Sequence, residues 1–570
     1  MSLARTLFKT WNPLWRAWAR LQLSRAKHRS LAGHPRMGLR LSRLVKGYAY
    51  EGQGWFDSDG ASPEFIRLRR EGLARLRTHF TTTSPRTIEA TRALEDGVSD
   101  LAFTNRYRVP FQFRDAVAES LPVGAFAESS DGIRLRDLDG QESMDLGGSY
   151  GVNLFGTDFY KQCLERAFTR AQALGLVLGP YHPVIADNVA RLKAISGMDE
   201  VSFHMSGTEA VMQAVRLARY HSKKRYVVRF CGAYHGWWDG VQVGPGNPLP
   251  NTDVLTLTEQ SERTLNVLRM RDDIACVLVN PLQAMTPNAS PSSDSALVGG
   301  ERKAHYDKAA YIRWLKQLRE VCTEKGIALI FDEVFLGFRL ARGGAQEYFG
   351  VKADLVTWGK TLGGGLPVGV VCGPHRLMRR FRDDRPADIC FARGTFNSHP
   401  YVMTAMNEFL AFLDTPQARA TWDDLDGRWD RRAAQLNAAL EAARVPVRMA
   451  NMTSVFVTRF LQPGRYHWML QFYLRAQGLS LSWIGSARFI FSHDWTDEDF
   501  AELSRRLVAA CQQMQADGWF HVPAKPTARV LVSEMIDAVV GRRPAPRPLL
   551  PLPVSPPAEV PATAPDRLVA

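Results

Sequence analysis

Short apolar runs that alternate with amphipathic stretches dominate the middle of the 570-residue chain. Each run has four to six residues and is bounded by glycine or polar residues, which is typical of strands buried in a parallel sheet. Between the runs, apolar residues recur every three to four positions, as in 209–219 and 306–325, which predicts helices. This alternation predicts an α/β fold with a mostly parallel, doubly wound sheet. The predicted strands are Val201–His204, Arg225–Phe230, Ile274–Val279, Ile327–Phe331 and Ala353–Trp358.

Two of these strands end on residues that carry chemistry. Asp332 and Glu333 follow one of them, and Gly359 and Lys360 follow the next, before a turn of three glycines at 363–365. In open α/β sheets, ligands bind at the carboxyl ends of the strands. An acid and a lysine at that edge suit pyridoxal 5'-phosphate (PLP), which needs a lysine for its Schiff base and an anion beside its pyridine nitrogen. Taken alone, the same residues also fit a buried ion pair beside a glycine turn.

A second turn has the composition of an anion site. Ser206–Thr208 joins a predicted strand to the helix predicted over 209–219. Small residues at such a turn leave backbone N–H groups and the positive end of the helix dipole open to an anion. An ordinary capped helix fits this turn equally well when it is considered alone. Tyr234 and His235 follow another predicted strand, where an aromatic ring can cover a flat ligand by stacking.

The positive charge of the chain is concentrated at its amino terminus. The formal net charge is +14, and residues 1–46 contain eleven Lys or Arg and no acidic residue. The other 524 residues therefore carry only +3. A nearly neutral body does not predict a nucleic-acid-binding surface.

The same segment predicts an amphipathic helix. Asn12 can cap it and Pro13 suits its first position. Leu14, Trp15, Trp18 and Leu21 share one face, with basic residues on the others. Two interpretations stay open for residues 1–33. The helix packs on the body or on a second subunit, or it makes a peripheral contact with an anionic membrane.

Several patterns limit the functional classes. Seven cysteines are scattered singly without zinc-ligand spacing, which predicts no metal site and a reducing, cytoplasmic location. No apolar run approaches the ~18 residues that span a bilayer. Gly147–Gly151 matches the GxSxG nucleophile elbow, so a hydrolase using Ser149 is a remote alternative. The strand before this motif is short and polar and no clear helix follows it, so we expect an accidental match.

Five motifs, in order along the chain, resemble the class III aminotransferases. They are SGTEAVMQAVRLAR, GAYHGWWDG, LIFDEVFLGFR, TWGKTLGGGLPVG and ARGTFNSHP. The resemblance covers about 131–510. It implies a fold-type-I PLP-dependent enzyme with a large domain and a smaller α+β domain, assembled as a homodimer with the active site at the subunit interface. Glutamate-1-semialdehyde aminomutases are close relatives of this family.

The resemblance also implies roles for individual residues. Lys360 would link PLP and move the proton at the substrate Cα, and Asp332 would pair with the pyridine nitrogen. Val334 would pack on the ring face opposite Tyr234, and Thr395 would reach the phosphate from the neighbouring subunit. The catalytic candidates are Lys360, Asp332 and Tyr234, and the cofactor-binding candidates are Ser206, Gly207, Thr208, Tyr234, His235, Asp332, Val334, Lys360 and Thr395.

The substrate pocket is predicted less fully. Many relatives have Glu-Pro where this chain has Asn280-Pro281, a polar residue at the position of Met285, and Met or Gln at the position of Phe335. The pocket is therefore expected to favour an apolar amine or aldehyde. Arg488 stands where ornithine-type aminotransferases carry the arginine that binds a substrate carboxylate, a task suited to a guanidinium. The leading hypothesis is an aminotransferase that uses a small amino donor and a carbonyl acceptor. An aminomutase that moves the amino group within one molecule is the alternative.

The predicted organisation has six segments. A basic amphipathic arm covers 1–46 and a helical extension covers 47–130. Segments 131–170 and 400–525 form the small domain, and 171–399 forms the large PLP-binding domain. The tail, 526–570, is rich in proline and is predicted to be disordered.

Overall fold

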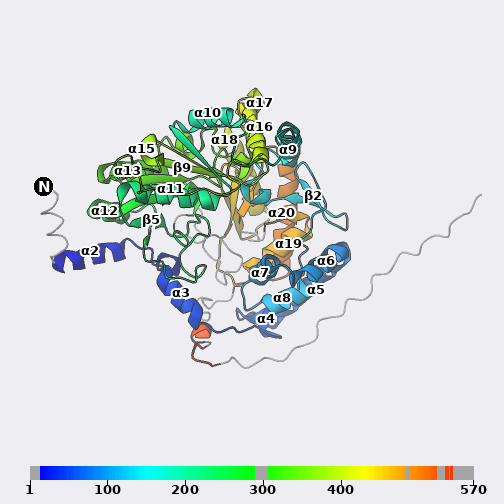
Figure 1. The fold of residues 1–570 in the computed structure, drawn as a ribbon. Helices are drawn as coiled ribbons and strands as arrows, with labels where there is room; N and C mark the ends of the chain where they lie inside the picture. Colours follow the sequence, from blue (N-terminus) through cyan, green and yellow to red (C-terminus); the bar gives the residue numbers. More distant parts are fainter. Residues whose placement is uncertain are drawn as a thin grey trace, which may run out of the picture.

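The computed structural model describes residues 13–286, 288, 306–482, 488–522, 533–537 and 539–542. Its largest sheet has seven strands in the order β4-β10-β9-β8-β7-β5-β6 (Figure 1). Six strands run parallel, and β10 is antiparallel to both of its neighbours. The strands are β4 (Glu200–His204), β5 (Tyr226–Phe230), β6 (Val254–Leu257), β7 (Ile274–Val279), β8 (Ala328–Asp332), β9 (Leu355–Gly359) and β10 (Gly369–Gly373).

The predicted α/β class and all five predicted strands are confirmed, with ends that shift by one or two residues. Strands β6 and β10 were not predicted. The helix expected over 306–325 is α13 (Lys308–Lys325), which begins later because the Asp307 side chain accepts a hydrogen bond from the Ala310 N–H and caps it. Gly326 ends the helix in the left-handed conformation, with φ 58°.

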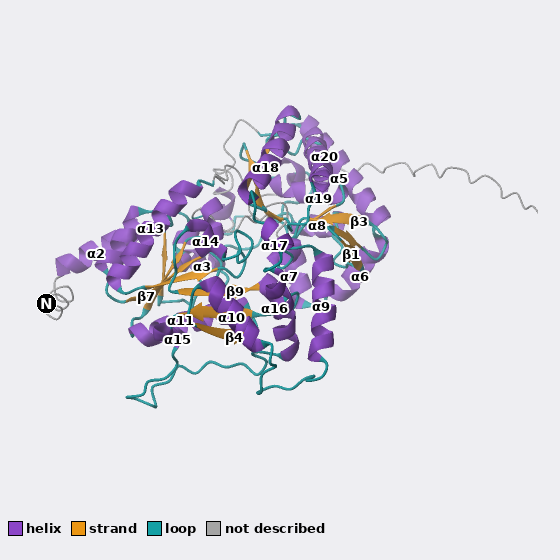
Figure 2. Ribbon diagram, turned by 90° about the horizontal axis from the view of Figure 1, so that it is seen from above, coloured by secondary structure: helices purple, strands orange, loops and turns teal. Residues whose placement is uncertain are grey.

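Helices cover both faces of the large sheet, and alternate residues of each strand separate the two layers. On β7, Cys276 and Leu278 pack with α11 (Gly207–Ser222), whereas Val277 and Val279 pack with α13 on the opposite face. This burial on both sides explains the uninterrupted apolar runs. The other helices of these layers are α10 (Ile185–Ser196), α12 (Glu262–Met270), α14 (Gly344–Phe349), α15 (His375–Met378) and α16 (Pro400–Phe412) (Figures 1 and 2).

Two smaller sheets lie beside the large one. The first is an antiparallel meander of three short strands, β1 (Ser129–Asp131), β2 (Arg134–Arg136) and β3 (Glu142–Asp145). A distant segment, β13 (Leu479–Ser480), adds to it in parallel next to β3. The second sheet is β11 (Val447–Met452), β12 (Val455–Phe460) and β14 (Arg488–Ile490). Helix α18 (Leu425–Ala442) packs on β11, whereas α19 (Leu470–Ala476) and α20 (Asp497–Ala516) pack on each other and on β13.

The extension before the meander is helical, as predicted, and lies next to α19 and α20 (Figure 1). Trp55 and Phe113 share one core with Trp468 and Trp519. Arg69 is buried among them and pairs with Asp59 at 2.7 Å. The helices of this extension are α4 (Gly54–Asp57), α5 (Pro63–Thr83), α6 (Pro85–Glu95), α7 (Ser99–Tyr107) and α8 (Arg114–Ser120).

The amino-terminal arm contains α2 (Pro13–Arg25) and α3 (Pro35–Leu44). The predicted helix therefore starts at the expected proline, and it lies along α12 (Figure 1). Leu14, Trp18 and Leu21 are exposed on its surface. No helix in the described parts of the chain is both long and apolar enough to cross a membrane. Trp11, the rest of residues 1–12 and nearly all of the proline-rich tail lie outside the described residues.

Candidate active site

The ends of two neighbouring parallel strands bring an acid and a lysine to one edge of the large sheet. Asp332 is the last residue of β8 and pairs in register with Thr357 of β9, and Lys360 directly follows β9. Asp332 is only 4% exposed. Lys360 has φ +49°, a left-handed conformation that costs a non-glycine residue free energy and that clusters at functional sites.

Asp332 is held by donors from three elements. His235 Nδ1 donates to Asp332 Oδ2 at 2.7 Å, while the Val334 N–H and the Thr357 hydroxyl donate to Oδ1 at 3.3 and 3.4 Å. The His235 ring is fully buried, and burial lowers its pKa although the neighbouring carboxylate opposes that shift. A neutral ring with its proton on Nδ1 satisfies this contact. His235 thus lies behind the acid and orients it, so Tyr234 is the aromatic residue left to cover a ligand.

The amine of Lys360 is tuned by the same surroundings. Burial lowers its pKa; Asp332 counteracts this shift, and Arg339 adds to it. A lowered pKa increases the fraction of neutral amine, which is the form that attacks a carbonyl. The site therefore contains a nucleophilic nitrogen close to a fixed carboxylate.

Three turns converge beside this pair. Ser206 caps α11 by accepting a hydrogen bond from the Glu209 N–H at 3.2 Å. A Cβ on Gly207 would lie 2.5 Å from Val334 Cγ1, and a Cβ on Gly236 would lie 2.6 Å from Thr208 Oγ1. Glycine is thus required at 207, where the turn before α11 meets the segment after β8. It is also required at 236, where the turn after β5 meets the start of α11. The start of α11 is left as a cradle of backbone N–H groups of the type that binds phosphate.

Two predicted site residues are exposed in the single chain. Tyr234 is 58% exposed, and its carbonyl accepts a hydrogen bond from Asn280 Nδ2 at 3.1 Å. Burial of its hydroxyl and then the charge of Asp332 raise the pKa of Tyr234. Thr395 lies exposed on the loop between α15 and α16, and no contact among the described residues joins it to Asp332 or Lys360. Its expected reach into a neighbouring subunit stays a prediction.

Arg488 lies close to the same site. The ring centre of Phe335 is 5.9 Å from Lys360 Nζ and 5.9 Å from the Arg488 guanidinium carbon. Because both distances are measured to the same ring centre, Lys360 Nζ and the Arg488 guanidinium carbon lie at most about 12 Å apart. Arg488 Nε is buried without a hydrogen-bond partner, and burial lowers the pKa of this guanidinium to about 10. Gly151 lets Phe335 lie close, because a Cβ there would be 2.8 Å from the ring.

Two buried residues near the site were not predicted. Glu333 accepts a hydrogen bond from the Ala345 N–H at 2.6 Å, and burial raises its pKa to about 8. Arg339 donates to the carbonyls of Phe491 and Asn153 at 2.6 and 3.0 Å, so it ties the segment after β8 to distant parts of the chain. Both residues fall inside a recognisable motif, but only the tertiary structure reveals their partners.

The GxSxG segment does not form a nucleophile elbow. Ser149 and Tyr150 lie in a short 3-10 turn, Gly148–Gly151, with φ 45° and 57°. The preceding strand ends at Asp145, and the next helix, α9 (Thr157–Ala171), begins only after eleven intervening residues. A strand, a sharp turn and a directly following helix are what a nucleophile elbow requires.

The residues of this edge fit PLP. The lysine supplies an amine, the buried carboxylate supplies the partner for a pyridine nitrogen, and the glycine turn at α11 leaves space for a phosphate. Val334, wedged between Gly207 and Gly359, presents an apolar surface at the same place. Each chemical group of the cofactor thus has a counterpart among the described residues.

Comparisons with known proteins agree with this chemistry. The sequence profile of the Aminotransferase class-III family matches residues 116–242 and 307–510, more than half of the chain. Glutamate-1-semialdehyde 2,1-aminomutase of Methanococcus maripaludis is 32% identical over 356 residues, which is 60% of this chain and 77% of the relative. The corresponding protein of Geotalea daltonii is 31% identical over 364 residues, with 60% and 78% covered.

Solved structures share the fold. A structure described as a transaminase with PLP bound superposes with a TM-score of 0.60 at 26% identity, covering 76% of this chain and 99% of that one. A glutamate-1-semialdehyde aminomutase from Pseudomonas aeruginosa PAO1 gives a TM-score of 0.61 at 20% identity, with 78% and 98% covered. The chain belongs to the class III aminotransferases, fold-type-I enzymes whose cofactor is PLP.

Proposed function

We propose that this protein transfers an amino group from a small-molecule donor to an aldehyde or ketone acceptor, with Lys360 as the residue that links PLP. The main support for this proposal is that Lys360 and Asp332 lie together at the ends of adjacent strands, beside the start of α11. PLP, when bound, supplies the electron sink for bond changes at the substrate Cα.

Each residue of the site then has a distinct task. Lys360 Nζ takes the proton from the substrate Cα and returns it, because it is the basic group placed beside the carboxylate. Asp332 keeps a negative charge opposite the pyridine nitrogen, and His235 fixes the orientation of that carboxylate. Phe335 forms an apolar wall that excludes water, and Arg488 binds a carboxylate of the substrate.

Intermolecular transfer and intramolecular transfer both fit this machinery. The relatives named as aminomutases favour the second, and the transaminase neighbour favours the first. An assay with a ¹⁵N-labelled amino donor and a separate carbonyl acceptor distinguishes them. An aminotransferase delivers the label to the acceptor and needs both compounds, whereas an aminomutase isomerises one compound with no second substrate. Label that never leaves the donor skeleton would overturn the aminotransferase proposal.

The proposed assembly is a homodimer. Support comes from the exposed loop that carries Thr395 and from the exposed ring of Tyr234, both of which suit a second subunit that completes the site. Sedimentation of the purified protein tests this. A Thr395→Ala variant that loses PLP faster than the parent, while staying dimeric, supports a contact with the phosphate across the interface.

The proposed location is the cytoplasm, with a peripheral membrane contact through residues 1–33. All seven cysteines are free and buried, which suits a reducing compartment. On α2, exposed Leu14, Trp18 and Leu21 accompany basic residues such as Arg16 and Arg20. Co-sedimentation with anionic vesicles tests the contact. A Trp18→Ser/Leu21→Ser variant that sediments as well as the parent would overturn it.

A further inference from the structure

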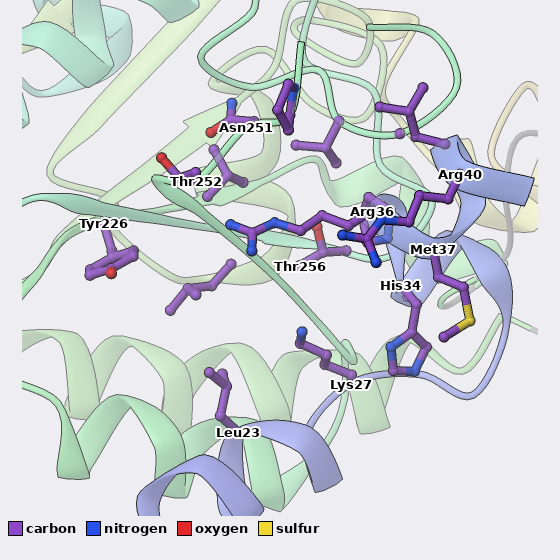
Figure 3. A pocket seen from close by; sticks show the side chains of 18 of the residues that line it. Leu23, Lys27, His34, Arg36, Met37, Arg40, Tyr226, Asn251, Thr252 and Thr256 are labelled. Carbon is purple, nitrogen blue, oxygen red and sulfur yellow. The ribbon is translucent and has the colours of Figure 1, made fainter. Parts of the chain in front are cut away.

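A second cavity, separate from the active site, lies between the amino-terminal arm and the edge strand β6. Its volume is about 450 Å³, and it shares no lining residue with the site at Lys360. One wall is the arm from Leu23 to Arg40, and the other is β6 with the loop that precedes it (Figure 3). The lining also includes Tyr226, at the start of β5.

Backbone contacts fix the arm in this position. The Thr258 N–H donates to the Ala26 carbonyl at 2.9 Å, and Arg43 donates to the Pro248 carbonyl at 2.9 Å. Gly38 of α3 also lies beside Pro245, where an added Cβ would make an ordinary contact at 3.7 Å. The cavity is therefore an open groove between elements that are anchored to each other, with Arg36 and Arg40 exposed at its edge.

Three cations of the cavity have no partner of opposite charge among the residues that the structure describes. Lys27, Arg36 and Arg40 point into the space in front of Thr256 (Figure 3). Within the described part of the chain, none of the three forms an ion pair or a side-chain hydrogen bond, and no lining residue is acidic. A fourth cation, Arg271, is neutralised by Asp273 at 2.6 Å. Burial, and then the charge of Arg36, lower the pKa of Lys27.

The remaining lining divides into a polar part and an apolar part. Asn251, Thr252 and Thr256 offer neutral hydrogen-bonding groups, and the apolar side chains are Leu23, Leu39, Leu249 and Val254. Arg36 and Arg40 are one helical turn apart on α3, so their guanidinium groups reach the same ligand from adjacent positions. Guanidinium forks match phosphate oxygens, and three cations suit a dianion better than a carboxylate with a single charge.

We propose that this cavity binds a phosphate monoester that carries an apolar substituent. The phosphate lies among Lys27, Arg36 and Arg40, and the substituent lies against Leu23 and Leu39. Two sources offer this chemistry, a soluble phosphorylated metabolite and the headgroup of phosphatidic acid. The site is distinct from the phosphate cradle at α11 and does not depend on the reaction at Lys360.

Titration calorimetry on the full-length holoenzyme tests the proposal, with the cofactor site already filled by PLP and excess PLP removed. The probes are inorganic phosphate and hexyl phosphate. We expect saturable binding of both, with hexyl phosphate at least tenfold tighter, because each buried methylene contributes about 0.8 kcal/mol, or roughly fourfold in affinity. Binding should weaken as salt rises.

A matched pair of variants distinguishes binding in the cavity from a general effect of positive charge on the protein surface. Arg36→Gln/Arg40→Gln removes two charges from the cavity, and Arg16→Gln/Arg20→Gln removes two charges with the same spacing from the exposed surface of α2. The cavity variant should lose at least tenfold in affinity for hexyl phosphate, and the control should change less than twofold. Equal losses in both, or no saturable binding by the parent, would overturn the proposal. Lys27→Gln offers an independent check on the same cluster.

Vesicles distinguish the two sources. Phosphatidylcholine vesicles containing phosphatidic acid are compared with vesicles containing phosphatidylglycerol at equal charge. Preference for phosphatidic acid that is lost in Arg36→Gln/Arg40→Gln identifies the lipid headgroup. Tight hexyl phosphate binding without that preference identifies a soluble monoester, and both results support the site. Failure of hexyl phosphate to compete with any bound phosphatidic acid would overturn it.

Discussion

Arg488 offers a sharp test of how the active site recognises its substrate. Its guanidinium is buried near Phe335 with Nε unpartnered, so the free enzyme holds a cation that no described carboxylate balances. Arg488→Met removes the charge and keeps the approximate length of the side chain. If a substrate carboxylate pairs with Arg488, the variant loses a charge-assisted interaction worth about 2–5 kcal/mol, and 3–4 kcal/mol corresponds to roughly 10²–10³-fold in kcat/KM.

The assay compares the best amino-acid donor with the amine that lacks only its carboxyl group. We expect kcat/KM for the amino acid to fall by about 10²–10³-fold and that for the amine to change less than threefold. Arg488→Lys should lie between the two enzymes, because a lysine keeps the charge but not the two-pronged geometry. The control is Arg459→Met, which removes another half-buried arginine from the same small sheet.

Thermal unfolding provides an independent measurement, because the substitution that lowers activity is not expected to lower the stability of the ligand-free protein. Removing a buried, unbalanced cation should leave the ligand-free protein as stable as the parent or more stable. A carboxylate analogue of the donor should raise the Tm of the parent and not that of Arg488→Met. Equal kinetic losses with the amino acid and the amine would refute the carboxylate role and show that Arg488 only supports the packing around Phe335.

Four further predictions concern the rest of the site. Borohydride treatment of the purified protein should fix PLP to the peptide that contains Lys360, and Lys360→Ala should abolish turnover while the protein stays folded; a label on another lysine would contradict this. Asp332→Asn should retain PLP but lose at least about 10³-fold in rate, because the charge opposite the pyridine nitrogen is gone; a near-normal rate would make the acid structural. Gly207→Ala should weaken PLP retention by overpacking against Val334, and adding Val334→Ala should restore it; no rescue would exclude that contact as the cause. Burial raises the folded-state pKa of Glu333 to about 8, so the folded state holds this proton more tightly and stability should fall as pH rises from about 4.5 to 8; Glu333→Gln should flatten that part of a urea-unfolding profile, and an unchanged slope would count against it.

The sequence was sufficient to predict the strands that lead to Asp332 and Lys360, because five buried apolar runs between helices specify a parallel sheet. It was not sufficient for β6, which has only four residues and lies at the sheet edge. The antiparallel direction of β10 was predictable in principle. Nine residues separate it from β9, too few for a crossover connection.

The contacts between side chains of different strands could not be predicted from the sequence. His235 meets Asp332 because β5 and β8 lie two positions apart with β7 between them, and no local pattern encodes that spacing. Arg339 resembles a surface residue in the sequence, yet it is buried among carbonyls from distant segments. The same holds for Lys27 and Arg36. The arm was recognised as basic, but its fold against β6 is what gathers those charges around one cavity.

The adjacent acids at the end of β8 show why charge cannot be assigned from sequence letters. Asp332 accepts hydrogen bonds from three donors, which fix the orientation of its carboxyl group. Glu333 is fully buried and accepts one from the Ala345 N–H, so burial dominates and its pKa rises to about 8. At neutral pH most Glu333 side chains are therefore protonated. Of the two adjacent acids, Asp332 is the one that three donors orient, and it is the proposed partner of the pyridine nitrogen.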